Sequence, residues 1–138
     1  MNNNMNPVVH FEMGYKDKQR AVNFYTKVFG WKAKMMGPEM GNYVVVTTTE
    51  TDEQRMIKQP GAINGGFYKK EKAKHYPSIV IAVVDITQAM QRVRDAGGQI
   101  LGGRTPDEPD DIPGIGLYAS FIDTEGNRVG MLQPVRKQ

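Results

Sequence analysis

Two side chains near the N-terminus, an imidazole and a carboxylate, are the first candidates for chemistry in this sequence. They are His10 and Glu12, in a stretch of valine, phenylalanine and methionine that predicts a strand. Alternate residues of a strand point to the same face, so the pair shares one face. A carboxylate beside an imidazole can orient it and raise its pKa, which suits a general base or a polar ligand site. The alternative is structural: Glu12 pairs with a neighbour such as Arg128, and packing holds His10.

Residue counts exclude several other kinds of site. The chain of 138 residues has no cysteine, which excludes disulfides, thiolate metal sites and cysteine nucleophiles. Two histidines are too few for a histidine-rich metal centre. The net charge of +3 accompanies no nucleic-acid motif, no phosphate-binding glycine loop and no GxSxG turn. Without a membrane span or a signal peptide, the sequence favours a cytoplasmic protein with neither nucleic-acid nor membrane partners.

Aromatic side chains form the second group of candidates. Those on or beside predicted strands are Trp31, Tyr43, Phe67, Tyr68 and Tyr118. Aromatic rings that line a concave sheet make an apolar site for a flat ligand. Their alternative role is packing, either in the core or in a dimer interface.

Four carboxylates gather in one segment flanked by prolines. Between Pro106 and Pro113 stand Asp107, Glu108, Asp110 and Asp111. Their spacing lacks the regular donor pattern and final glutamate of an EF-hand, which argues against calcium. We expect a solvated loop at the mouth of a cavity, where it would control access.

The predicted elements must explain how these side chains are positioned. Hydrophobic periodicity predicts a helix from Asp17 to about Phe29, ended by Gly30, and a second helix from Asp85 to about Ala96. β-Branched and aromatic runs bounded by turn residues predict the strands. These span residues 8–13, 31–36, 43–49, 65–69, 77–84, 99–103, 117–122 and 128–133. The expected fold is therefore α+β, with two strand–helix–strand–strand–strand (βαβββ) modules.

Weak self-similarity supports the two modules. Three residues of the first helical region, Asp17, Ala21 and Gly30, recur 68 residues later as Asp85, Ala89 and Gly98. The modules run from about residue 7 to 70 and from about 76 to 134, and we expect a single domain over residues 1–138. A module of about 60 residues buries the faces of its own sheet poorly, so the two should pair, within one chain or between two.

Three segments resemble the vicinal-oxygen-chelate superfamily, which includes glyoxalases, bleomycin-resistance proteins and extradiol dioxygenases. They are Val8–Glu12 followed by Asn23–Trp31, Ile81–Asp85 followed by Arg94–Gly98, and Phe121–Arg128. The stretch Ile112–Gly116 is similar to a poorly characterised branch related to lactoylglutathione lyase. The resemblance implies two βαβββ modules whose curved mixed sheets surround a cavity.

The same resemblance implies where the metal enzymes of the superfamily place their ligands, one on each of four strands. His10 falls on the first of these positions. Ile79 (or Ser78, one residue before it), Gly130 and the Gly65–Phe67 stretch offer no imidazole or carboxylate. This incomplete set argues against metal-dependent glyoxalase or dioxygenase activity. We therefore expect no bound metal and no cofactor.

The function predicted first is metal-free binding of a small hydrophobic or aromatic molecule in the sheet cavity. The residues expected to contact it are His10, Glu12, Trp31, Tyr43, Phe67, Ile79, Ile81 and Tyr118. The second hypothesis is a lyase- or dioxygenase-type enzyme that uses His10 and Glu12. The third is an interaction module whose cavity is filled by its own side chains. A homodimer is expected, because the superfamily often associates through its sheets or helices.

Overall fold

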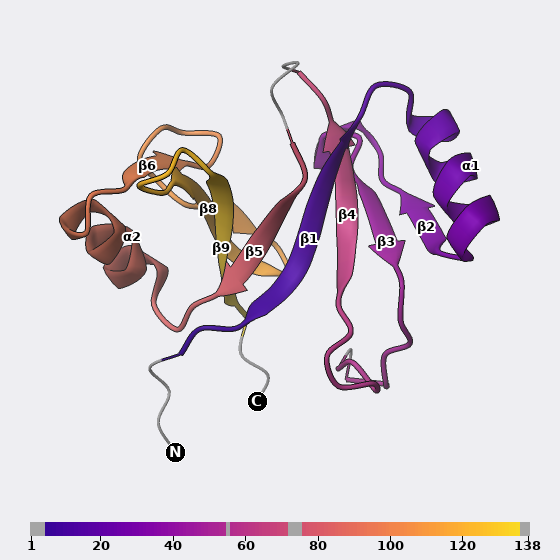
Figure 1. Cartoon of the computed structure of the whole chain (residues 1–138), viewed down its shortest axis with the longest axis horizontal. Coiled ribbons are helices and arrows are strands. Elements are labelled where there is room, and N and C mark those ends of the chain that lie inside the picture. Colours follow the sequence, from indigo (N-terminus) through magenta and orange to yellow (C-terminus); the bar gives the residue numbers. More distant parts are fainter. Residues whose placement is uncertain (1–4, 55, 72–75, 136–138) are drawn as a thin grey trace. The chain divides into compact units, whose positions relative to one another are not determined.

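The computed structural model describes residues 5–54, 56–71 and 76–135 (Figure 1). The chain divides into two compact units: the first is His10–Pro77, and the second consists of residues 1–9 together with residues 78–138. Within the described residues, each unit has one α-helix and a set of strands with both parallel and antiparallel pairs. The predicted α+β class and its two βαβββ modules are therefore confirmed. His75 lies outside the described residues.

The first unit begins within strand β1. Its elements are β1 (Val8–Tyr15, in this unit from His10), α1 (Lys18–Phe29), β2 (Lys32–Met35), a 3-10 turn (Pro38–Met40), β3 (Val44–Thr47) and β4 (Asn64–Lys69). β1 pairs with β4 in parallel, whereas β4 with β3 and β3 with β2 are antiparallel. The order β1-β4-β3-β2 places the last strand of the module beside its first.

The second unit repeats this order. Its elements are β5 (Ser78–Ala82), α2 (Ile86–Asp95), β6 (Gln99–Gly102), β7 (Asp110–Ile112), β8 (Gly116–Ile122) and β9 (Arg128–Pro134). β5 pairs with β9 in parallel, and β9 with β8 and β8 with β6 are antiparallel, giving β5-β9-β8-β6. Equivalent strands of the two modules can therefore be compared position by position.

Strand β7 corrects one prediction. The segment from Pro106 to Pro113 was expected to be a loop throughout, but Asp110–Ile112 pair antiparallel with β8, on residues 116–118. The Asp110 carboxylate also accepts the backbone N–H of Arg104 at 2.8 Å. The loop prediction was wrong for these three residues because backbone pairing with β8 across the turn at residues 113–115, rather than hydrophobic alternation, forms the strand.

Both helices begin where the sequence predicts. The carboxylate of Asp17 accepts the N–H of Arg20, and that of Asp85 accepts the N–H of Gln88, each at 3.0 Å. Such bonds satisfy N–H groups that have no partner inside the helix. Gly30 ends α1 in the left-handed conformation, with φ of 72°. The 68-residue repeat thus marks equivalent helix starts.

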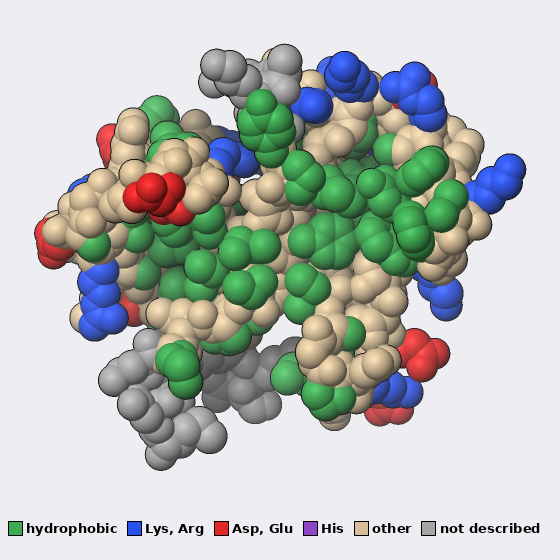
Figure 2. All heavy atoms as spheres, viewed as in Figure 1, with side chains coloured by type: hydrophobic (Ala, Val, Ile, Leu, Met, Phe, Trp, Pro, Cys, Tyr) green, Lys and Arg blue, Asp and Glu red, His purple; other side chains and the backbone are tan. Residues whose placement is uncertain are grey.

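Each helix packs on one face of its own sheet, although α1 packs less deeply. Around α1 the buried residues are Tyr15, Val44, Val46 and Phe67; around α2 they are Val83, Ile86, Met90, Ile100, Ala119 and Met131. All residues of α1 are described and none is buried, whereas α2 buries Ile86 and Met90. Hydrophobic side chains accordingly gather on the surface beside α1 (Figure 2), where Phe24, Val28 and Phe29 are each more than half exposed.

Candidate functional site

A chain of two hydrogen bonds joins three of the predicted site residues in the first unit. The Tyr43 hydroxyl lies 3.2 Å from His10 Nε2 and donates to Glu12 Oε2 at 3.1 Å. All three side chains are partly buried. We call this group the His10–Tyr43–Glu12 relay. The prediction that His10 and Glu12 share a face is confirmed, and the bridging tyrosine is a contact that the sequence did not indicate.

Strand geometry explains why the relay lies on the face away from α1. Phe11 and Met13 pack in the core beneath α1. Because side chains alternate along a strand, His10 and Glu12 point to the opposite face. We call that face the open face of the first unit. Tyr43 directly precedes β3 and lies two residues before Val45, so the two side chains point to the same face. Val45 pairs with Gly66, and Gly66 pairs with Glu12, which places all of them on the open face.

Gly66 makes room for the tyrosine ring. A Cβ atom at Gly66 would collide with the ring and hydroxyl of Tyr43, and one at Gly65 would collide with the ring of Phe11 on the other face. Glycine in a strand often marks such a close approach. The pair Gly65-Gly66 therefore lets one aromatic ring lie across each face of β4. The sequence signal was present in the two glycines, but it does not name the rings.

The hydrogen-bond donors fix the form of the imidazole. A tyrosine hydroxyl has one proton, and the carboxylate of Glu12 is an acceptor only, so that proton lies between Tyr43 and Glu12. The tautomer that suits this arrangement has the proton on His10 Nε2, which then donates to Tyr43. Burial lowers the pKa of His10 below its ordinary value, which favours the neutral ring. In that tautomer the lone pair of neutral His10 resides on Nδ1.

Two predicted aromatic ligand contacts lie in the core instead of on the open face. Trp31 stacks on Tyr25 of α1 with ring centroids 4.9 Å apart and also contacts Phe11. Phe67 is 2% exposed and lies 5.3 Å from Tyr25 between ring centroids. The structure thus brings Tyr43 together with His10 and Glu12, and it places Trp31 and Phe67 beneath α1.

The second unit has the same arrangement of tyrosine over glycine. Tyr118 of β8 lies over Gly130 of β9, where an added Cβ would meet the tyrosine ring and hydroxyl. Gly130 pairs with Val80 of β5, just as Gly66 pairs with Glu12. Ser78, two residues before Val80, corresponds to His10. The positions that hold an imidazole and a carboxylate in the first unit thus hold a hydroxyl and an aliphatic side chain in the second.

The remaining predicted ligand contacts of the second unit lie on two different faces of its strands. Ile81 packs against the core beneath α2, and Ile79 shares its face. Ser78 and Val80 share the opposite face with Tyr118. The sequence assigned the position equivalent to His10 to Ile79, with Ser78 as the alternative; the sheet register selects Ser78, so the first assignment was wrong by one residue. Ligand contacts by Ile79, Ile81 and Tyr118 remain predictions.

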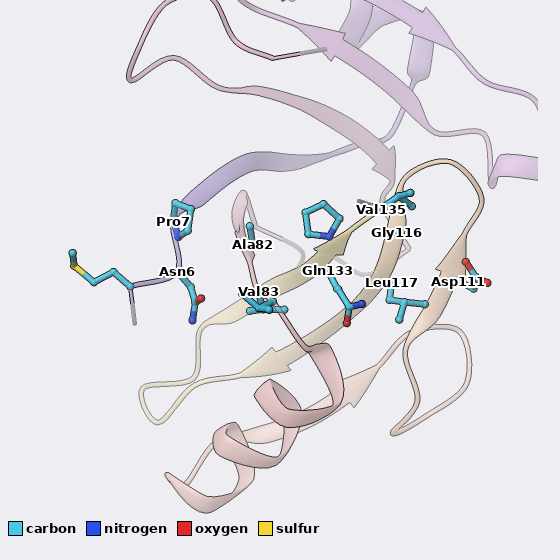
Figure 3. A pocket seen from close by; sticks show the side chains of 12 residues that line it. Asn6, Pro7, Ala82, Val83, Asp111, Gly116, Leu117, Gln133 and Val135 are labelled. Atoms are coloured by element: carbon cyan, nitrogen blue, oxygen red, sulfur yellow. The ribbon is translucent and has the colours of Figure 1, made fainter. Parts of the chain in front are cut away.

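A groove of about 540 Å³ opens at one end of the second unit's sheet (Figure 3). None of the predicted site residues lines it. Its walls are formed by Met5, Asn6, Pro7, Ala82, Val83, Val84, Asp111, Gly116, Leu117, Gln133, Pro134 and Val135. The amide oxygen of Gln133 accepts the N–H of Ile86 at 2.9 Å, which ties that side chain to the start of α2. The groove is mainly apolar, and its polar side chains form no relay like that of the first unit.

Within the described residues, the donor set for a divalent metal is incomplete in each unit. Among the described residues, no three His, Cys, Asp or Glu side chains gather in a group that could hold a metal ion. In the first unit His10 Nε2 and Glu12 are joined through Tyr43. In the second unit the corresponding positions, Ser78, Val80 and Gly130, offer no imidazole or carboxylate. These side chains do not fit a four-ligand site for Zn²⁺ or a similar ion.

Sequence comparison identifies the family. Residues 8–131 match the family described as Glyoxalase/Bleomycin resistance protein/Dioxygenase superfamily. The chain belongs to this superfamily. The match agrees with the repeated βαβββ order and with the resemblance carried by the three sequence segments. No curated protein has a significantly similar sequence.

Solved structures share the fold of this superfamily member at low sequence identity. A methylmalonyl-CoA epimerase is 15% identical, with a TM-score of 0.66, covering 98% of this chain and 100% of that one. The Mycobacterium tuberculosis methylmalonyl-CoA epimerase is 14% identical, with a TM-score of 0.61 and coverage of 94% and 88%. A Streptomyces coelicolor methylmalonyl-CoA epimerase variant in complex with 2-nitronate-propionyl-CoA is 14% identical, with a TM-score of 0.67 and coverage of 96% of each chain. Among the residues described, no helix is long and apolar enough to span a membrane.

Proposed function

We propose that this protein binds a small organic molecule, without a metal, on the open face of the first unit. The observation that carries the proposal is the His10–Tyr43–Glu12 relay. Buried polar groups held in a hydrogen-bonded chain are costly to assemble unless they are fully partnered. In this relay His10 Nδ1 is left as an acceptor, and no hydrogen bond to it is recorded among the described residues. A ligand O–H or N–H group would satisfy it.

The ligand expected from this geometry is more polar than the sequence alone suggested. The rings of Trp31 and Phe67 pack beneath α1, so they are not available as an aromatic box on the open face. Apolar contact there would come from Val45, which is 41% exposed, and from the ring of Tyr43. A molecule with a modest apolar body and one hydrogen-bond donor fits these surfaces best.

Nuclear magnetic resonance on protein with ¹⁵N-labelled histidine tests this proposal. Phenols and amides are titrated beside their O- or N-methylated analogues, and the His10 Nδ1 signal is followed. Donor-bearing compounds should shift that signal, while their methylated analogues should not. Tyr43→Phe should weaken binding roughly five- to tenfold, because it removes the bond that fixes the ring. Tyr76→Phe, at a residue that is 70% exposed, is the matched control. A His10 signal indifferent to every donor would overturn the proposal.

A second candidate function is proton transfer by His10. A proton taken up at Nδ1 would be stabilised by Glu12 through Tyr43, because Nε2–H and the tyrosine hydroxyl point toward the carboxylate. The similarity to methylmalonyl-CoA epimerases makes methylmalonyl-CoA the first substrate to test. The measurement is deuterium incorporation at its α-carbon in D₂O, with His10→Ala as control. Exchange that is unchanged by the substitution would eliminate this candidate.

We also propose that the protein forms the homodimer expected from the sequence. The exposed apolar side chains of α1, Phe24, Val28 and Phe29, would lose contact with water in such an interface. Sedimentation velocity of the wild type and of Val28→Glu separates the outcomes. A dimer that becomes a monomer on substitution supports association through α1, and a monomeric wild type removes the proposal.

A further inference from the structure

Two lysines share the open face with the relay. Lys34 of β2 pairs with Val45 of β3, Val45 pairs with Gly66 of β4, and Gly66 pairs with Glu12 of β1. Paired residues of neighbouring strands point to the same side of a sheet. These four paired residues form a row across the sheet of the first unit. The row runs from the ammonium group of Lys34 on β2 to the relay on β1. Lys32 lies two residues before Lys34 on the same face of β2 and pairs with Thr47. It is displaced from Lys34 in the direction that leads from Glu12 to His10.

The surface between the lysines and the relay has small side chains and is partly apolar. Gly66 has no side chain, and Val45 is 41% exposed. Three strand spacings of about 4.8 Å separate β1 from β2, so the span is roughly 14 Å. Lysine side chains are long and bend along a surface, which shortens the distance that a ligand must bridge. A molecule about 10 Å long would reach from His10 to an ammonium group.

The charges of these lysines are available to a ligand. Lys32 and Lys34 are both exposed, and neither forms an ion pair within the part of the chain that the structure describes. Glu12, the acidic residue at the other end of the row, accepts a hydrogen bond from the hydroxyl of Tyr43. An alternative explanation is that lysines on β2 prevent pairing of this edge strand with other chains. That role predicts no dependence of binding on ligand charge.

We propose that the ligand is an organic anion whose carboxylate or phosphate lies against Lys32 and Lys34 while its hydrogen-bond donor contacts His10 Nδ1. The inference rests on the proposed function, because it extends the same open face from β1 to β2. It names the chemical class of the ligand: an anionic group and an O–H or N–H donor at opposite ends of a small apolar body.

The test uses three probes on one scaffold and the full chain. 3-(4-Hydroxyphenyl)propanoate carries the anion and the donor, its methyl ester lacks the charge, and 2-(4-hydroxyphenyl)ethyl phosphate replaces carboxylate by phosphate. Dissociation constants come from amide chemical shifts at low salt. The wild type should bind the carboxylate or the phosphate about five- to tenfold more tightly than the ester, and added salt should reduce the difference.

Matched double variants then locate the charge effect. Lys32→Met/Lys34→Met should remove the preference for the anion and leave ester binding unchanged. Arg20→Met/Lys27→Met removes the same charge from α1 and should keep the preference. His10→Ala should weaken anion and ester equally. Whichever anion binds more tightly identifies the group that the lysines select.

The outcomes distinguish this inference from the proposed function. Equal binding of anions and ester in the wild type, with His10-dependent shifts, overturns the anionic ligand and leaves the proposed function standing. The same holds if the lysine and α1 variants lose the preference alike, because the effect is then net charge. Failure of all three probes to perturb residues of the open face overturns both.

Discussion

The two units have the same strand order, and each places a tyrosine ring over a glycine. They differ in the side chains of the strand that pairs with that glycine. In the first unit Tyr43 crosses Gly66 to reach Glu12 and His10. In the second, Tyr118 crosses Gly130, and the equivalent β5 positions hold Val80 and Ser78. A shared backbone thus supports a hydrogen-bonded imidazole and carboxylate in one module, and a hydroxyl and an aliphatic side chain at the equivalent positions of the other. The chemistry belongs to two residues, not to the fold.

The helices give the largest expected difference between the units. Ile86 begins α2 and is 1% exposed, whereas α1, described in full, buries none of its residues. Ile86→Ala should lower the free energy of unfolding by about 2–5 kcal/mol through lost burial and a cavity. Val22→Ala, on the packed side of α1, should cost about 1 kcal/mol or less because its side chain is only partly buried. Urea denaturation measures both, and equal costs would contradict the difference in packing.

Adding a methyl group to each glycine separates fold from site. Gly66→Ala should displace Tyr43, lower the free energy of unfolding by about 1–3 kcal/mol, and abolish ligand-induced shifts of His10. Gly130→Ala meets Tyr118 less closely, so it should cost less stability and leave the His10 signal unchanged. Denaturation and histidine NMR are the two readouts. A Gly66→Ala protein with an undisturbed His10 signal would contradict the positioning role.

Removing one hydroxyl from each tyrosine isolates the relay. Tyr43→Phe should shift the ¹⁵N signals of His10 toward a mixture of tautomers and cost about 1 kcal/mol of unfolding free energy, because two hydrogen bonds are lost. Tyr118→Phe should leave the His10 tautomer unchanged. If His10 kept one tautomer in Tyr43→Phe, another contact would have to fix the ring.

The pH dependence of stability should be the smallest effect. Burial holds the pKa of folded His10 below the ordinary 6.5, so the unfolded chain takes up this proton first as the pH falls. The free energy of unfolding is therefore highest above pH 6.5. It declines as the pH falls from 6.5 toward the pKa of folded His10. His10→Gln should flatten this part of the curve, measured by urea denaturation between about pH 8 and 5. An unchanged slope would show that His10 titrates alike in both states.

Local signals predicted most of the fold. Asp17 and Asp85 cap their helices through bonds to residues three positions later, so their role can be deduced from a few neighbouring residues. The strand parity of His10 and Glu12 is equally local. β7 escaped prediction because its pairing with β8 depends on a turn and a partner strand rather than on its own three residues.

The site was only partly predictable because it depends on register. A shift of one residue moves a side chain to the other face of a sheet. The sequence favoured Ile79 over Ser78 as the counterpart of His10, whereas the pairing of β5 with β9 selects Ser78. Nor could it show that Trp31 and Phe67 pack beneath α1 while Tyr43 turns to the open face. Those assignments require knowing which strands are neighbours.

The sequence by itself determined the two modules, the helix ends and the common face of His10 and Glu12, because each follows from residues within about one helical turn or one strand. Only the tertiary structure decided that Tyr43 would join them. That contact spans 33 residues from His10 and 31 from Glu12, and it needs β4 to lie between β1 and β3 with a glycine in the path of the ring. Distant side chains meet only when strand order and register are fixed, and both arise from packing of the whole unit.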